Sequence, residues 1–158
     1  FKLVDLFTAT ENIILGLEGK LDIAEASKKV KEICDKYGFD IDPNQKIYDM
    51  SVSQKQTVEI VKVLYRGADI LILDEPTAAL DPIAENDIYQ KYSDMTAGKT
   101  SVFISHRLAS TRFCDRILFI ADGGIAEEGT HKELLAKGGA YAELFAVQSR
   151  YYQEGKAF

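Results

Sequence analysis

Two adjacent carboxylates, Asp74 and Glu75, directly follow the apolar run 70–73, Ile-Leu-Ile-Leu. Such a run without polar alternation predicts a strand buried on both faces of a parallel sheet. Open α/β sheets bind ligands at the carboxyl ends of their strands. There Asp74 can hold Mg²⁺ while Glu75 orients or deprotonates a water, as transfer of a phosphoryl group to water requires. One alternative stays open, because acidic residues ahead of a helix also stabilise its N-terminus.

A second candidate is the segment 50–54, Met-Ser-Val-Ser-Gln, which leads into a predicted helix. Hydroxyl groups and free backbone N–H groups at the positive end of a helix suit an anion. Ser51 and Gln54 also fit the capping box S/T-x-x-E/Q, which satisfies the same N–H groups without a ligand. The sequence therefore leaves two hypotheses for this segment, anion binding and helix capping.

His106 follows the predicted strand 101–105 and is a third candidate. Histidine titrates near neutral pH, so its ring can donate to or accept from a phosphate or a water. A histidine at a strand end is more often structural, and that interpretation also stays open. The nearby Gly-Lys-Thr at 98–100 resembles the end of the phosphate loop G-x-x-x-x-G-K-[ST], but Ser93 replaces its first glycine and a strand follows. We therefore predict no phosphate loop there.

The elements that must position these residues follow from hydrophobic periodicity and from turn signals. Strand, helix and strand follow one another from residue 70 to residue 105, so a right-handed parallel crossover is expected. Residues 1–19 are expected to be apolar and turn-like, without a capping sequence of their own, as if cut from a longer chain. Helices are predicted over 23–37, 53–65, 83–95, 106–113, 131–137 and 139–150, and a hairpin at the sheet margin from 116–120 and 125–128.

Composition narrows the class of protein. A chain of 158 residues, 46% of them hydrophobic, can bury a core and most simply forms one domain with a small helical annex. The formal charge of -6 makes nucleic acid an unexpected partner. Cys34 and Cys114 lie far apart in the sequence, without the spacing of metal-binding cysteines. Single thiols of this kind are typical of proteins in a reducing compartment such as the cytoplasm. No apolar run approaches the roughly 20 residues of a membrane-spanning helix.

Taken together and in this order, the motifs resemble those of the ATP-binding cassette (ABC) family of transporter ATPases, over essentially all of the chain. Residues 50–54 are similar to the signature L-S-G-G-Q, and residues 70–75 to the Walker B strand with its catalytic glutamate. Ala79-Leu80-Asp81 matches the D-loop, and residues 105–107 match the segment of the switch histidine. The resemblance implies an α/β fold, the distal half of a P-loop NTPase core with a mostly parallel sheet plus a helical subdomain.

The resemblance also implies roles for individual residues. ATP and Mg²⁺ are the implied cofactors, with Glu75 and His106 catalytic and Asp74 holding Mg²⁺ through water. In an ATP sandwich dimer, the signature residues Ser51, Val52, Ser53 and Gln54 contact ATP bound to a second ABC ATPase subunit, and Ala79, Leu80 and Asp81 form the D-loop.

Partners, location and division of the chain are implied in the same way. Residues 1–66 would form the helical subdomain with the signature and its following helix, and residues 67–158 the C-terminal part of the ATPase core. The partners would be transmembrane permease subunits or domains and the second ATPase subunit, with no nucleic acid. The expected location is the cytoplasmic face of the cell membrane.

Three departures from the family pattern qualify these expectations. The 158 residues contain no phosphate loop, no upstream adenine-stacking aromatic residue and no Q-loop glutamine, so the chain alone is not expected to turn over ATP. The signature has Met50 for Leu and has Val52 and Ser53 for the two glycines, and Ser53 costs little only if its φ is negative. Residues 9–13 and 58–79 resemble sugar or nucleoside importers, whereas residues from 84 onward resemble exporters.

Two other functions stay open. The chain can be a non-catalytic fragment or fusion product that folds, or that offers its signature loop to an intact partner subunit. It can also be a soluble ABC-type ATPase that works on DNA or ribosomes. The acidic balance and the absence of long heptad segments or basic tracts argue against the latter.

Overall fold

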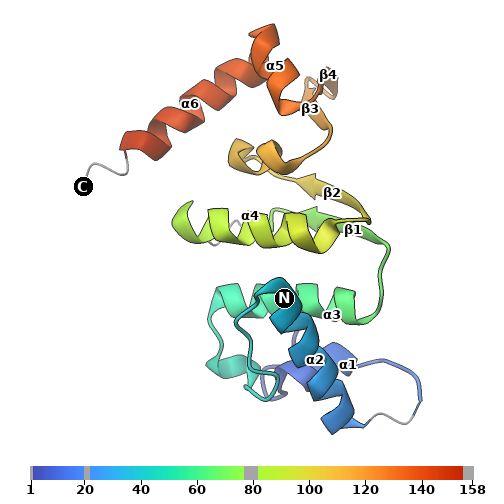
Figure 1. Cartoon of the computed structure of the whole chain (residues 1–158). Coiled ribbons are helices and arrows are strands. Elements are labelled where there is room, and N and C mark those ends of the chain that lie inside the picture. The colour runs from blue at the N-terminus through green and yellow to red at the C-terminus, as the bar shows by residue number, and fades with distance from the viewer. Residues whose placement is uncertain (1, 20–21, 77–81, 155–158) are drawn as a thin grey trace.

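The computed structural model describes residues 2–19, 22–76 and 82–154. Its elements lie roughly in chain order along the long axis of the molecule, with α1 and α2 at one end and α5 with the β3–β4 hairpin at the other (Figure 1). The helices are α1 (Ala9–Ile14), α2 (Ile23–Tyr37), α3 (Val52–Tyr65), α4 (Pro82–Thr96), α5 (His131–Lys137) and α6 (Ala140–Glu154), with the short 3₁₀ turns η1 (Ile47–Asp49) and η2 (Leu108–Phe113). The strands are β1 (Ile70–Asp74), β2 (Thr100–Ile104), β3 (Ile117–Ala121) and β4 (Gly124–Gly129).

Helix α1 corrects the expectation that the first 19 residues are turn-like and uncapped. The Thr8 hydroxyl accepts a hydrogen bond from the Glu11 backbone N–H, and the Glu11 carboxylate accepts one from the Thr8 N–H at 2.6 Å. This is a complete capping box, and its signal T-x-x-E is present at residues 8–11 of the sequence. The capping signal alone does not predict a helix here, because the six residues that follow are too few to show a helical period.

Asn12 ties the N-terminal segment to α1. Its side chain is fully buried. The amide oxygen accepts from the Val4 N–H at 2.7 Å, and the amide nitrogen donates to the carbonyl oxygens of Val4 and Thr8 at 3.1 and 3.0 Å. A buried amide must find such partners, because an unpaired polar group away from water is costly.

The predicted helices α2 and α3 form for the expected reasons. Asp22 caps α2 by accepting from the backbone N–H groups of Ala24 and Glu25, and Gly38 ends it in the left-handed conformation that favours glycine (φ 67°). The apolar faces of the two helices meet in one core that extends across β1 into α4. Its buried members include Val30, Cys34, Val58, Val61, Leu71, Tyr92 and Met95.

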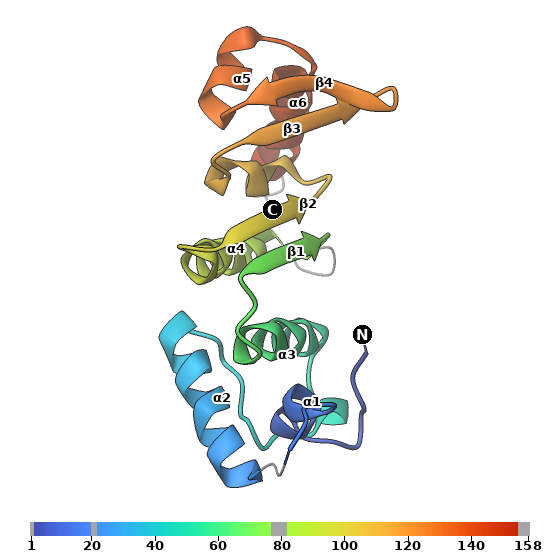
Figure 2. The same cartoon turned by 90° about the vertical axis from the view of Figure 1, so that its right-hand side faces the viewer.

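The sheets differ from the prediction in two respects. As expected, β1 pairs with β2 in parallel, from Ile70 opposite Thr100 to Asp74 opposite Ile104. However, β1 is buried on one face only: Leu71 is 4% exposed, whereas Ile70 and Ile72 are 66% and 69% exposed. The reason is that Leu71 packs into the core that includes α4, while no layer of the described chain covers the opposite face (Figure 2).

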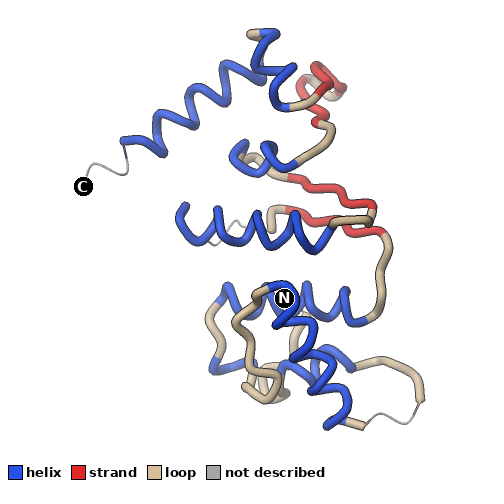
Figure 3. Tube along the Cα trace, viewed as in Figure 1, coloured by secondary structure: helices blue, strands red, loops and turns tan. Residues whose placement is uncertain are grey.

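The hairpin is the second difference. Strands β3 and β4 pair antiparallel as predicted, but they form a two-stranded sheet of their own and not the margin of the β1–β2 sheet. A separate apolar cluster of Leu108, Ile117, Leu134 and Tyr141 joins this hairpin to η2, α5 and α6. Figure 3 shows the two strand pairs in red at separate levels of the molecule. Within the described ranges, every helix is too short or too polar to cross a membrane.

We expect Asn12→Ala to lower the free energy of unfolding by about 2 kcal/mol, because it leaves the Val4 N–H without its partner and removes one of the two hydrogen bonds that the Val4 and Thr8 carbonyl oxygens each accept. Chemical denaturation measures this change. The matched control is Asn44→Ala: Asn44 is exposed, and its side chain accepts one long hydrogen bond of 3.3 Å from Ser27. A loss in Asn12→Ala no larger than that of the control would contradict the assignment of Asn12 as a structural clamp.

Candidate functional site

The site begins where β1 and β2 end. Because the strands are parallel and in register, their last residues lie side by side, and the residues that follow leave the sheet at the same edge. The Glu75 N–H donates to the Ile104 carbonyl oxygen at 2.8 Å. One oxygen of the Glu75 carboxylate, Oε1, accepts from the His106 backbone N–H at 2.9 Å and lies 2.7 Å from the His106 ring nitrogen Nδ1. The structure therefore brings together two residues that are 31 positions apart.

Glu75 is held in an unusual backbone conformation. Its φ of 44° lies in the left-handed region, which non-glycine residues seldom adopt. Its second carboxylate oxygen, Oε2, is buried and has no hydrogen-bond partner among the described residues. Strained backbone and unpaired buried oxygens are each costly, and both gather at functional sites. The Glu75 carboxylate thus keeps one acceptor oxygen that the described residues do not use.

The surroundings of Glu75 favour its charged form. Burial raises the pKa of the carboxyl group, but the hydrogen bonds from the ring and the backbone of His106 lower it, and the net result is a pKa below the ordinary value of 4.5. A carboxylate with a lowered pKa is a weak base, so it is better suited to orienting a water than to removing its proton. The His106 side chain is 70% exposed, which leaves its ring accessible.

Asp74 is the last residue of β1, and its side chain is exposed. Carboxylate oxygens are ligands that Mg²⁺ prefers, and Mg²⁺ commonly binds one or two carboxylates together with waters and substrate phosphates. No group of three or more acidic, histidine or cysteine side chains suited to a metal occurs among the described residues. Asp74 therefore fits a Mg²⁺ that arrives with a phosphate and keeps its own waters.

The structure bears on the two hypotheses for residues 51–54. Ser51 is the N-cap of α3: its hydroxyl accepts from the Gln54 N–H at 3.2 Å, and the Gln54 side chain accepts from the Ser51 N–H at 3.0 Å. Helix capping is thus realised. Val52 is half exposed in the first turn, and Ser53 lies in the helix, where its φ is not positive. The Cβ of Ser53 therefore brings no left-handed strain.

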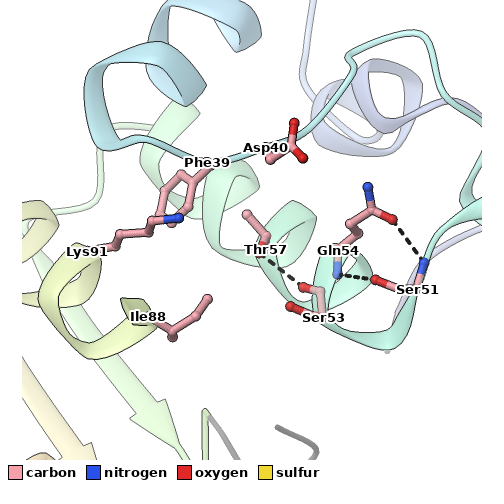
Figure 4. Close-up of a pocket in the computed structure, with 8 residues that line it drawn as sticks. All are labelled: Phe39, Asp40, Ser51, Ser53, Gln54, Thr57, Ile88 and Lys91. Atoms are coloured by element: carbon pink, nitrogen blue, oxygen red, sulfur yellow. Dashed lines mark hydrogen bonds between the residues drawn. The ribbon is translucent and has the colours of Figure 1, made fainter. Parts of the chain in front are cut away.

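A pocket of about 370 Å³ opens beside the start of α3 (Figure 4). Hydroxyl groups on α3 and the ammonium group of Lys91 on α4 give it a polar lining that suits an anion, although Asp40 also lines it. Thr57 donates to the Ser53 carbonyl oxygen at 3.0 Å inside this lining. The lining residues are Phe39, Asp40, Ser51, Ser53, Gln54, Thr57, Ile88 and Lys91. The sequence pattern gives no signal for Lys91, because its position in the pocket lining depends on how α4 packs against the rest of the chain.

Side chains from α3 and α4 bind the segment that follows β1. Gln56 of α3 donates to the Pro76 carbonyl oxygen, and the buried Tyr92 hydroxyl donates to the same oxygen at 3.3 Å. Pro76 directly follows Glu75, and Gln56 lies two residues after the segment 51–54. The hydrogen bond from Gln56 to Pro76 therefore connects the start of α3 with the backbone next to Glu75. The predicted D-loop residues Ala79, Leu80 and Asp81 lie outside the described residues.

Comparisons with known proteins show which family this chain resembles. The family model described as "ABC transporter" matches residues 2–78. The nucleoside import ATP-binding protein NupA of Lactococcus lactis is 47% identical over 129 residues, which cover 78% of this chain and 26% of that protein. The ABC multidrug transporter MDR1 of Cryptococcus neoformans is 41% identical over 112 residues, or 71% of this chain and 8% of that protein.

A solved structure supports the fold. A bacterial Atm1-family ABC exporter with ATP bound is 32% identical, with a TM-score of 0.68 over 93% of this chain and 27% of that chain. The chain belongs to the ABC transporter family of ATP-binding proteins and has the fold of their ATPase domain. It is similar both to nucleoside and guanosine import proteins and to an ABC exporter, as the sequence predicted. It spans about a quarter of the length of the nucleoside-import relatives.

We expect His106→Ala to raise the pKa of the Glu75 carboxyl group, because burial still opposes its charge while the hydrogen bond from the ring is lost. Carboxyl ¹³C NMR titration of both proteins measures the pKa. Glu133 is the internal control: the backbone hydrogen bond at Thr130, which this substitution does not touch, lowers its pKa. An unchanged Glu75 pKa in the variant would show that the ring does not hold this carboxylate.

Proposed function

We propose that this chain contributes the Walker B, switch and signature residues to an ATP-hydrolysing site of an ABC transporter. The pairing of Glu75 with His106 carries the proposal. It combines a carboxylate kept charged, a buried oxygen without a partner and an accessible imidazole at the edge of a parallel sheet. In this function ATP is the substrate, and Mg²⁺ neutralises the charge on its phosphates.

Each residue has a role that follows from its surroundings. The free oxygen of Glu75 accepts a hydrogen bond from the attacking water and orients it toward the phosphate. His106 engages Glu75 through Nδ1, so its Nε2 remains available to contact a phosphate oxygen or the same water. Asp74 would hold the Mg²⁺ through a water.

Residues 51–54 are proposed to contact ATP bound to a second ABC ATPase subunit. Capping does not prevent this, because a serine hydroxyl has two acceptor sites and one donor, and the cap of α3 uses an acceptor site only. The Ser51 O–H can therefore still donate to a phosphate oxygen. Val52, Ser53 and Gln54 would contribute at the same helix start, and Ala79, Leu80 and Asp81 at the dimer interface.

Other residues must complete the site, because the 158 residues contain no G-x-x-x-x-G-K-[ST] loop to hold the β- and γ-phosphates. We propose that residues 1–66 act as the helical subdomain and residues 67–158 as part of the ATPase core, docked on transmembrane permease subunits at the cytoplasmic face of the membrane. The missing loop equally favours a second function, in which the chain offers its signature to an intact subunit without hydrolysing ATP itself.

Glu75→Gln tests the hydrolytic role. In an assembly that joins these residues to a phosphate loop, we expect ATP hydrolysis to slow by about 100-fold or more while ATP binding is retained, since only the water-orienting carboxylate is lost. Steady-state turnover and nucleotide binding measure the two effects. Glu32→Gln, an exposed carboxylate on α2, is the matched control and should leave both unchanged. Normal turnover in Glu75→Gln would remove Glu75 from its proposed role.

Substitutions of Ser51 separate capping from anion contact. Aspartate is as good an N-cap as serine, so Ser51→Asp should keep α3 stable, yet its charge should abolish ATP-dependent association with an intact ABC ATPase subunit. Ser51→Ala should instead destabilise the helix by about 1 kcal/mol. Thermal unfolding and analytical ultracentrifugation with and without ATP measure the two effects. Association of Ser51→Asp at wild-type strength would leave Ser51 with capping as its only role.

A further inference from the structure

One face of α6 contacts the segment that carries His106. Tyr141, Phe145 and Gln148 are spaced by four and three residues, so they lie on the same side of the helix. Each of the three touches a different part of residues 106–112. This arrangement joins the last helix of the chain to the residues that follow β2.

Gln148 makes the most specific of these contacts. Its amide oxygen accepts from the Leu108 N–H at 2.9 Å, and its amide nitrogen donates to the His106 carbonyl oxygen at 2.8 Å. The side-chain amide thus pairs with the backbone as a neighbouring strand would, one donor and one acceptor at once. Only an amide side chain offers both groups in this geometry.

The other two contacts place α6 against η2. The Tyr141 hydroxyl lies 2.6 Å from the Thr111 hydroxyl and 2.7 Å from the His131 ring nitrogen, and Tyr141 is fully buried. The Arg112 guanidinium lies 5.2 Å from the centre of the Phe145 ring, within cation–π range. Gln148 is therefore presented to residues 106 and 108 by a helix that is itself anchored.

We propose that Gln148 is a positioning residue for His106. The His106 side chain is 70% exposed, so its place depends on its bond to Glu75 and on the backbone that carries it. Gln148 holds that backbone on both sides of Arg107, at the carbonyl of residue 106 and the N–H of residue 108. This proposal rests on the proposed function for its consequence in catalysis, but the positioning itself can be measured without ATP.

The first test uses the 158-residue chain and hydrogen exchange followed by NMR. Gln148→Leu keeps the size of the side chain and removes both hydrogen bonds. We expect exchange of the Leu108 amide to speed up at least about tenfold, while the amides of β2 keep their protection. Unchanged Leu108 exchange would overturn the proposal.

Two further variants keep the test decisive. Gln90→Leu is the matched control, because Gln90 lies on α4 and, among the described residues, bonds to Asp94 of its own helix; it should leave Leu108 exchange unchanged. Gln148→Glu keeps the acceptor for the Leu108 N–H and removes the donor to the His106 carbonyl. If Gln148→Leu does not fold, Gln148→Glu should still shift the His106 carbonyl ¹³C resonance with Leu108 protected, and an unshifted resonance would overturn the proposal.

The second test separates this proposal from the proposed function. In the ATP-hydrolysing assembly, Gln148→Leu should lower kcat about tenfold or more with little change in the KM for ATP, whereas Gln90→Leu changes neither. If kcat is normal in Gln148→Leu while Leu108 exchange is faster, the expected effect of Gln148 on catalysis is wrong. If turnover is also normal in Glu75→Gln, the proposed function has failed, and the exchange data alone then decide whether Gln148 positions His106.

Discussion

The parallel pairing of β1 with β2 is the constraint on which the site depends. It sets Asp74 opposite Ile104, so the chain leaves both strands at one edge and Glu75 meets His106 there. An antiparallel pairing would send these two residues to opposite ends of the sheet. The left-handed backbone at Glu75 is tolerated because three bonds fix it, one from its own N–H to β2 and two from His106 to its carboxylate. Backbone strain is thus stored at the residue that pairs with His106.

Around the site, side chains form hydrogen bonds with backbone groups of the segments that follow β1 and β2. Gln56 and Tyr92 donate to the carbonyl of Pro76, just after Glu75, and Gln148 holds the backbone on either side of Arg107. These contacts come from α3, α4 and α6 in turn. The edge of the β1–β2 sheet is therefore supported by side chains from three helices, and such supporting contacts fix the geometry of the groups that they touch.

The start of α3 shows how one set of groups can serve stability and binding together. Its capping box satisfies the first N–H groups of the helix without a ligand, yet the hydroxyl hydrogen of Ser51 stays available. The pocket beside it adds the ammonium group of Lys91 on α4. Helix capping and anion contact are therefore compatible properties of this segment. The bond from Gln56 to Pro76 further ties the same helix to the segment of Glu75.

Sequence patterns are enough to predict the local elements and the candidate residues. Helix α2, which ends at Gly38, and the apolar run 70–73 with the carboxylates that follow it depend on periodicity, turn signals and composition, which are properties of neighbouring residues. By contrast, the exposure of Ile70 and Ile72, the separate sheet of the hairpin and the positions of Lys91 and Gln148 beside the site arise when the chain folds. These facts depend on which surfaces meet between residues far apart in the chain. A short-range pattern cannot encode them, because packing between elements is set by the sum of many weak contacts.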